Sequence, residues 1–142
     1  MKLLLDTVIV GRICHPRKYA EVRAWLAQVS AEHEPLLSEV ADYELRRELL
    51  RIGARRGLAH LDELSRELRY IPVTTATWRA AASLWALLRR TGKAAAADQA
   101  LDGDVLIAAQ AIADEATVVT SNKRHFEPLV PVLDWDEVPV RR

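Results

Sequence analysis

Three carboxylates stand beside apolar segments of this chain, where they could hold a cation. Asp6 directly follows the apolar run at 3–5, Asp104 precedes the apolar segment 105–113, and Glu44 borders the apolar stripe of a predicted helix. Two carboxylates about 4 Å apart repel by about 4 kcal/mol at an effective dielectric of 20, so three of them together need a cation. Oxygen ligands without clustered Cys or His favour Mg²⁺ or Mn²⁺ over zinc. Such an ion accepts phosphate oxygens and a water nucleophile, which is the chemistry of phosphodiester hydrolysis.

Each of these acids also has an ordinary structural interpretation. Asp6 can be a turn or cap residue after a strand, and Glu44 can form an i,i+3 surface pair with Arg47 worth about 0.2–0.5 kcal/mol. Asp102 and Asp104 both suit the N-terminus of a helix over 105–113, where the helix dipole favours an anion. Singly, none of them is specific. The metal site depends on a fold that brings the acids together.

The apolar pattern predicts strands that alternate with helices. Short continuous apolar or β-branched runs at 3–5, 36–37, 71–73 and 117–120 indicate buried strands, and Ser38 is a good N-cap for the helix that follows. Apolar residues with a helical period lie between these runs, at Val22, Trp25, Leu26 and Val29, at Leu45, Leu49 and Ile52, at Trp78, Ala81, Trp85 and Leu88, and throughout 105–113. This alternation predicts an α/β fold with a mostly parallel sheet covered on both faces. Such sheets bind ligands beyond the carboxyl ends of their strands.

Composition excludes several classes of protein. The chain has 142 residues, half of them hydrophobic, with 20 acidic and 20 basic residues, so neither disorder nor a uniformly basic coat fits. No repeat or linker divides it, and we expect a single domain over 1–142. The lone Cys14 and four scattered histidines provide neither a disulfide nor a zinc site. The apolar run near the N-terminus ends at Asp6, so we expect no export signal, no membrane association and a cytoplasmic protein.

Arginines gather on and after the predicted helix that carries Glu44. Guanidinium groups bind phosphates in a bidentate manner, so these residues could track a nucleic-acid backbone past the acids. A solvated, salt-bridged helix face explains the same pattern equally well. The cluster consists of Arg46, Arg47, Arg51, Arg55 and Arg56, with Lys123 and Arg124 in a later segment.

Three of the four tryptophans lie on predicted apolar stripes. Trp25, Trp78 and Trp85 are therefore predicted to be core residues rather than platforms for stacking bases. The pattern leaves the place of Trp135 open.

Four motifs along the chain resemble the PIN-domain nucleases, in particular the VapC-type toxins of type II toxin-antitoxin pairs. The motifs are Leu4-Leu5-Asp6-Thr7, Ser38 with Glu44-Leu45, the segment from Asp104 to Ala111, and Val119-Thr120-Ser121-Asn122 leading to Phe126. The Asp104 motif is the most specific of them. Their order and spacing extend the resemblance over essentially the whole chain.

The resemblance implies a three-layer α/β/α PIN-like domain that cleaves RNA with Mg²⁺ or Mn²⁺ as its cofactor. Asp6, Glu44 and Asp104 match the metal-binding catalytic acids of that family, and Asn122 stands where a fourth acid is often found. Asparagine offers a carbonyl but no charge, which weakens the case for a second ion. Asp98 and Asp102 precede the third motif, where some relatives place an additional acid, and Asp102 is the better candidate for a helper.

The same resemblance implies products and partners. Hydrolysis by a metal-bound water predicts 5′-phosphate and 3′-hydroxyl ends on the RNA. The family also implies a homodimer and a small antitoxin protein whose tail covers the acidic cleft, docked on the apolar side of the helices within 17–31 or within 46–68. The alternative is a catalytically weak PIN-like module that binds RNA or a partner, with Asn122 as the sign of lost activity.

Overall fold

A parallel five-stranded sheet forms the centre of the computed structural model, which describes residues 1–93 and 98–141. Its strand order is β3-β2-β1-β4-β5, and every neighbouring pair is parallel. Leu5 pairs with Leu37 on one side and with Val119 on the other, so the chain leaves three strands at the same edge. The strands are β1 (Lys2–Leu5), β2 (Glu34–Ser38), β3 (Arg69–Ile71), β4 (Thr117–Val119) and β5 (Val132–Leu133). The predicted parallel α/β sheet is confirmed.

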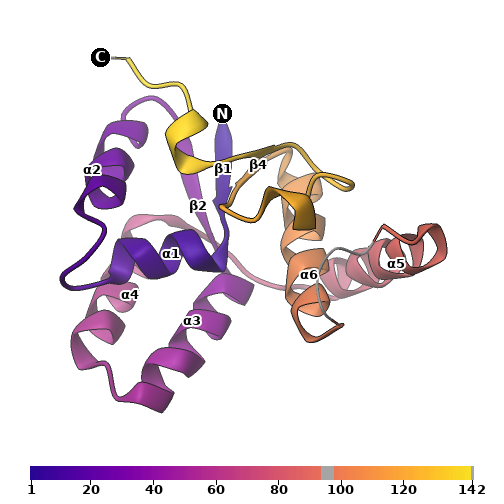
Figure 1. The fold of residues 1–142 in the computed structure, drawn as a ribbon, viewed down its shortest axis with the longest axis horizontal. Coiled ribbons are helices and arrows are strands. Elements are labelled where there is room, and N and C mark those ends of the chain that lie inside the picture. Colours follow the sequence, from indigo (N-terminus) through magenta and orange to yellow (C-terminus); the bar gives the residue numbers. More distant parts are fainter. Residues whose placement is uncertain (94–97, 142) are drawn as a thin grey trace.

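Helices cover both faces of the sheet, which gives the three layers of an α/β/α fold (Figure 1). They are α1 (Thr7–Cys14), α2 (Ala20–Val29), α3 (Glu39–Ile52), α4 (Arg55–Glu67), α5 (Thr75–Thr91) and α6 (Asp98–Asp114), with 3₁₀ turns η1 (Lys123–His125) and η2 (Trp135–Glu137). Side chains of β1 alternate between the layers: Leu4 packs with α5 and α6, whereas Leu3 and Leu5 pack with α1, α2 and α4. All three leucines are almost completely buried, which explains the uninterrupted apolar run.

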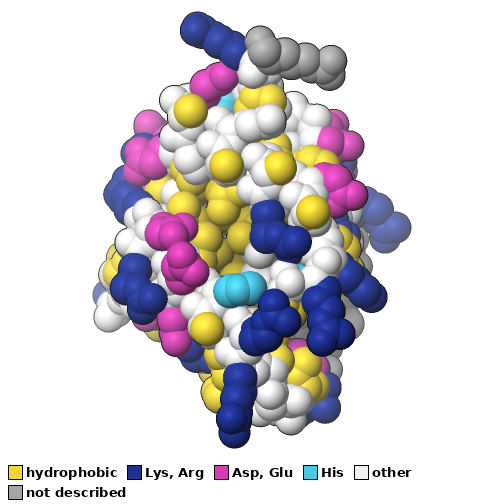
Figure 2. All heavy atoms as spheres, turned by 90° about the vertical axis from the view of Figure 1, so that its left-hand side faces the viewer, with side chains coloured by type: hydrophobic (Ala, Val, Ile, Leu, Met, Phe, Trp, Pro, Cys, Tyr) yellow, Lys and Arg dark blue, Asp and Glu magenta, His cyan; other side chains and the backbone are white. Residues whose placement is uncertain are grey.

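The face that carries α2 and α4 exposes hydrophobic side chains in its middle, bordered by acidic and by basic groups (Figure 2). These are two of the helices for which the sequence predicted an apolar outer side. Among the described residues, none of the helices has the length and apolar character needed to cross a bilayer.

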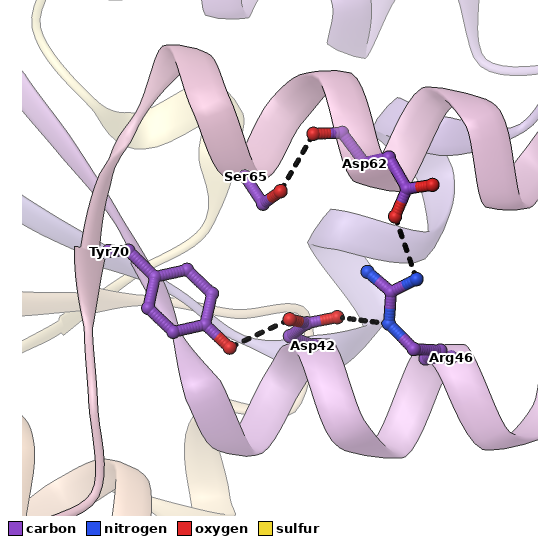
Figure 3. Close-up of polar contacts among 5 residues, drawn as sticks. All are labelled: Asp42, Arg46, Asp62, Ser65 and Tyr70. Carbon is purple, nitrogen blue, oxygen red and sulfur yellow. Dashed lines mark hydrogen bonds and ion pairs between the residues drawn. The ribbon is translucent and has the colours of Figure 1, made fainter.

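A polar network joins α3 to α4 and to β3 (Figure 3). The Asp42 carboxylate accepts hydrogen bonds from the Tyr70 hydroxyl at 2.7 Å and from Arg46 Nε at 2.9 Å. Arg46 Nη1 also contacts Asp62 Oδ1 of α4 at 2.7 Å, and the Ser65 hydroxyl donates to the carbonyl of Asp62. This network fixes the direction in which α3 leaves the sheet.

The structure corrects three details of the predicted elements. The third strand is Arg69–Ile71 rather than 71–73, because the backbone N–H of Val73 donates to the Glu39 carboxylate instead of joining the sheet. The helix predicted to begin at Asp104 already includes Asp98. Asp102 and Asp104 therefore lie inside α6 and do not cap it, and Asp104 is too far from the helix N-terminus to be stabilised by the helix dipole. The sequence also gave no prediction for α1 or β5.

Gln110 connects α6 to two strands inside the core. Its side chain is only 2% exposed, its Oε1 accepts from the Ser38 hydroxyl, and its Nε2 donates to the carbonyl of Ile71 at 3.0 Å. Ser38 Oγ in turn accepts from Val40 N at 3.0 Å, which confirms Ser38 as the N-cap of α3.

We predict that Gln110→Leu lowers the free energy of unfolding by about 2–4 kcal/mol, because a buried hydroxyl and a buried carbonyl both lose their partners. Urea denaturation measures the change. Gln28→Leu, at an exposed position of α2, is the matched control and should change stability by less than about 0.5 kcal/mol. Equal effects of the two substitutions would contradict this role for Gln110.

Candidate metal centre

Asp6 is fixed at the carboxyl end of β1 by hydrogen bonds to both oxygens. Its Oδ1 accepts from Thr7 N at 2.7 Å and its Oδ2 accepts from the Thr120 hydroxyl at 2.8 Å. The side chain is buried, and this burial raises the pKa of Asp6, with a further rise from the charge of Glu44; the hydrogen bonds from Thr120 and Thr7 lower it in part. Asp6 therefore caps α1 and also presents a carboxylate at the sheet edge.

Glu44 reaches the same edge from the second turn of α3. Its Oε1 accepts from the Thr7 hydroxyl at 2.8 Å, which ties it to the residue after Asp6. Gly103 of α6 lies directly against it: a Cβ at this position would come within 2.8 Å of Glu44 Oε2. The carboxylate of Glu44 thus occupies the space that any larger residue at 103 would need.

Asp104 of α6 is the third carboxylate of the acidic group, and it has the least stabilised negative charge of the three. Burial, together with the charges of Asp6 and Glu44, raises the pKa of Asp104 to about 7. Its Oδ2 is buried and has no hydrogen-bond partner among residues 1–93 and 98–141; His125 Nδ1 lies 3.2 Å away without the alignment of a hydrogen bond. A buried oxygen of this kind is suited to a ligand that the protein alone does not supply.

The donor set suits a hard divalent cation. Three carboxylates from β1, α3 and α6 are close enough to perturb one another electrostatically, and all their ligand atoms are oxygens. Within the described residues, no three Asp, Glu, His or Cys side chains stand in a finished metal-binding arrangement, and Glu44 is turned toward Thr7. The orphaned oxygen of Asp104 and its raised pKa are the observations that fit a cation at this edge.

The other predicted site residues have different surroundings. Asn122 is exposed and directly precedes η1; its backbone N–H donates to the Thr120 hydroxyl at 2.9 Å, which links it to Asp6 through Thr120. Asp102 is exposed on the wall of a neighbouring groove. The side chain of Asp98 falls outside the described residues.

Four residues of the centre were not predicted from the sequence. Thr7 and Thr120 orient the carboxylates, Gly103 makes room for Glu44, and His125 lies against Asp104. Both threonines stand directly after predicted strands and within two of the motifs that resemble the family, but the sequence assigned them no role. His125 gave no signal, because a single histidine after a turn is indistinguishable from a surface residue.

A groove of about 1120 Å³ adjoins the centre between α3 and α5. Glu44 and Gly103 form part of its wall, and so do Trp78 and Trp85. The prediction that these two tryptophans belong to the core is wrong: Trp78 is 59% exposed and Trp85 is 40% exposed, whereas Trp25 is buried as predicted. Trp135 packs edge-on against Trp25, with ring centroids 6.3 Å apart.

The basic cluster is partly a salt-bridged helix face. Arg46 is held by Asp42 and Asp62, Arg51 pairs with Glu48 one turn away, and Lys123 pairs with Glu137. For these cations the salt-bridge interpretation is confirmed. Arg55 and Arg56 are exposed at the start of α4.

A family model for the PIN domain matches residues 3–128, and the chain belongs to the PIN-domain family. The match spans the three carboxylates and Asn122. No curated protein matches the sequence significantly.

Several solved structures share this fold. VapBC2 from Rickettsia felis, bound to a DNA fragment from its promoter, is 22% identical with a TM-score of 0.79, covering 96% of this chain and 100% of that one. FitAcB from Neisseria gonorrhoeae is 23% identical with a TM-score of 0.72, covering 96% and 99%. VapC20 from Mycobacterium tuberculosis, described as a toxin that cleaves the sarcin-ricin loop, is 16% identical with a TM-score of 0.63, covering 90% and 96%.

We predict that metal-free protein loses stability as the pH rises from about 4 to about 7. The folded pKa of Asp104, about 7, lies above its ordinary value of 3.8, so the folded state holds a proton that the unfolded state releases over this range. Asp104→Asn removes this effect and should raise the free energy of unfolding at pH 8 in EDTA by about 2 kcal/mol, after discounting for solvent exposure. Glu63→Gln, an exposed acid of α4, is the control. An Asp104→Asn variant less stable than wild type at pH 8 would contradict the assignment.

A second prediction concerns the contact between Gly103 and Glu44. Replacing a helical glycine by alanine ordinarily adds up to about 1 kcal/mol of stability. Gly11→Ala in α1 should show such a gain, because its Cβ meets only Leu45 Cδ1 at 3.6 Å, whereas Gly103→Ala must displace the Glu44 carboxylate. The gain should return in the double variant Glu44→Ala/Gly103→Ala, giving a coupling free energy of about 1 kcal/mol by urea denaturation. Additive effects would show that the two residues are not in contact.

Proposed function

We propose that this protein is an Mg²⁺- or Mn²⁺-dependent endoribonuclease that acts as the toxin of a toxin-antitoxin pair. One observation carries the proposal: three carboxylates lie near one another at the carboxyl edge of the sheet, and in the described part of the chain a buried oxygen of Asp104 has no hydrogen-bond partner there. Membership of the PIN-domain family supports the same chemistry. The solved toxin that cleaves the sarcin-ricin loop has a similar fold.

Asp6, Glu44 and Asp104 would hold the ion in this proposal. When bound, Mg²⁺ or Mn²⁺ supplies Lewis acidity and lowers the pKa of a coordinated water. Thr7 and Thr120 keep two of the carboxylates oriented before the ion arrives, which reduces the reorganisation needed on binding. Asn122 offers a neutral carbonyl at the same edge.

The proposed reaction is hydrolysis of the RNA backbone by water. In this reaction one of the three carboxylates accepts a hydrogen bond from the attacking water and orients it for in-line attack. The water oxygen forms a bond to phosphorus while the bond from phosphorus to the 3′-oxygen breaks, and one proton of the water passes through that carboxylate to the leaving 3′-oxygen. The products are a 5′-phosphate and a 3′-hydroxyl.

The partners we propose are an RNA substrate, an antitoxin protein and a second copy of the chain, acting in the cytoplasm. The exposed hydrophobic side chains on the face of α2 and α4 give an antitoxin an apolar surface on which to dock (Figure 2). The solved VapBC2 and FitAcB structures share this fold, as does VapC20, which is described as a toxin.

We predict that the purified protein cleaves single-stranded RNA with Mg²⁺ or Mn²⁺ and that EDTA abolishes the cleavage. Asp6→Asn, Glu44→Gln and Asp104→Asn should each reduce the rate by about 100-fold or more, because each removes a charged ligand. Asn122→Ala should have a smaller effect, since it removes only a neutral carbonyl. Gel assays with end-group analysis measure both the rates and the product ends.

Glu63→Gln, which alters an acid outside the centre, should cleave at the wild-type rate. Cyclic-phosphate ends, or cleavage that persists in EDTA, would contradict the proposed chemistry. RNA binding without metal-dependent cleavage would instead favour the alternative of a catalytically weak PIN-like module.

A further inference from the structure

Three aromatic side chains are exposed in the groove that adjoins the metal centre. Tyr43 of α3 is 61% exposed, and Trp78 and Trp85 of α5 are 59% and 40% exposed. Burying a large apolar side chain ordinarily stabilises a protein by about 1.5–3 kcal/mol, so three such rings left open in one groove indicate a binding surface.

The groove has the chemistry of a nucleobase site. The guanidinium of Arg47 lies over the Tyr43 ring and that of Arg89 lies over the Trp85 ring, each 5.0 Å from the ring centre. Exposed aromatic rings bind single-stranded nucleic acids by stacking on the bases.

The acidic side chains on the groove wall are largely committed to the protein itself. Asp42 accepts hydrogen bonds from Arg46 and Tyr70. Glu39 accepts from the backbone N–H of Val73 at 2.9 Å. These pairings reduce the repulsion that a phosphate backbone would meet there.

We propose that this groove is a base-stacking subsite for single-stranded RNA, in which Trp78, Trp85 and Tyr43 stack on unpaired bases beside the phosphate to be cut. Trp78 and Trp85 are seven residues apart in α5, about 10 Å along the helix axis, so they contact different bases. Bases in a duplex stack on one another and are not free to do this, so the subsite selects unpaired RNA.

Continuity with the metal centre favours RNA over a protein as the occupant. Glu44 belongs both to the acidic group and to the groove wall, and Gly103 borders both. An RNA chain whose phosphate meets the carboxylates therefore has neighbouring nucleotides in the groove. This inference rests on the proposed nuclease function for its substrate, but it concerns binding and can be tested without cleavage.

The test measures the affinity of the full chain for a short fluorescein-labelled single-stranded RNA by fluorescence anisotropy. Asp6→Asn serves as the background, so that the RNA stays intact. Trp78→Ala and Trp85→Ala should each raise the Kd by about 5- to 150-fold, the measured range for losing one stacked base, while Trp78→Phe should retain most of the affinity. The slope of log Kd against log salt should not change, because removal of a ring alters no phosphate contact.

Two exposed tyrosines give a matched control. Tyr19 also has an arginine over its ring, with Arg12 5.6 Å from the centre, but it does not line the groove. Tyr43→Ala should weaken RNA binding and Tyr19→Ala should not. The same RNA annealed to its complement should bind less tightly and should lose its dependence on Trp78.

Several results would overturn the inference. Ring-removing variants that keep the Kd within twofold of the parent would do so, and so would variants that flatten the salt slope. A third such result is a loss of self-association, seen by sedimentation, with unchanged RNA affinity, which would identify the groove as a protein interface. Ring-dependent RNA binding by a wild-type protein that cannot cleave RNA would uphold the subsite and reject the nuclease.

Discussion

Electrostatic repulsion among Asp6, Glu44 and Asp104 is the constraint on which the rest of this structure depends. The parallel register that pairs Leu5 with both Leu37 and Val119 delivers three chain segments to one edge of the sheet. Asp6 and Thr120 emerge there directly, and α3 and α6 bring the other two acids to the same edge. The fully buried leucines of β1 provide the apolar stability that keeps these like charges together.

The protein offsets this repulsion unevenly. Hydroxyl groups of Thr120 and Thr7 donate to Asp6 and Glu44, and hydrogen bonds to the charged form favour ionisation. Within the part of the chain that the structure describes, Asp104 receives no such bond, and because it lies inside α6 the helix N-terminus does not stabilise its charge either. The protein therefore gives up stability at one carboxylate, a pattern found where a site is organised for a ligand rather than for folding.

Much of the scaffold was predictable from local sequence. The uninterrupted apolar runs identified β1 and β2, and Ser38 identified the start of α3, because strand burial and capping depend on adjacent residues. The start of α6 was not predictable in the same way, because an Asp followed by a Gly is typical of the residues just before a helix. Gly103 is instead a helical residue that makes room for the Glu44 carboxylate, a contact that only the tertiary structure shows. Trp78 and Trp85 were misplaced because a helical stripe shows that a face is apolar and not whether anything covers it. Contacts such as that of His125 with Asp104 arise only from the tertiary fold.

The most direct test of the central claim is a calorimetric titration of Mn²⁺ into the metal-free protein at pH 6.5, repeated in buffers of different ionisation enthalpy. The account predicts one saturable Mn²⁺ site per chain whose occupation releases a proton, because the pKa of Asp104 near 7 leaves it substantially protonated before binding. It also predicts that Asp104→Asn loses both the tight site and the proton release. Failure of the wild-type protein to bind Mn²⁺, or equal binding by Asp104→Asn, would contradict the account.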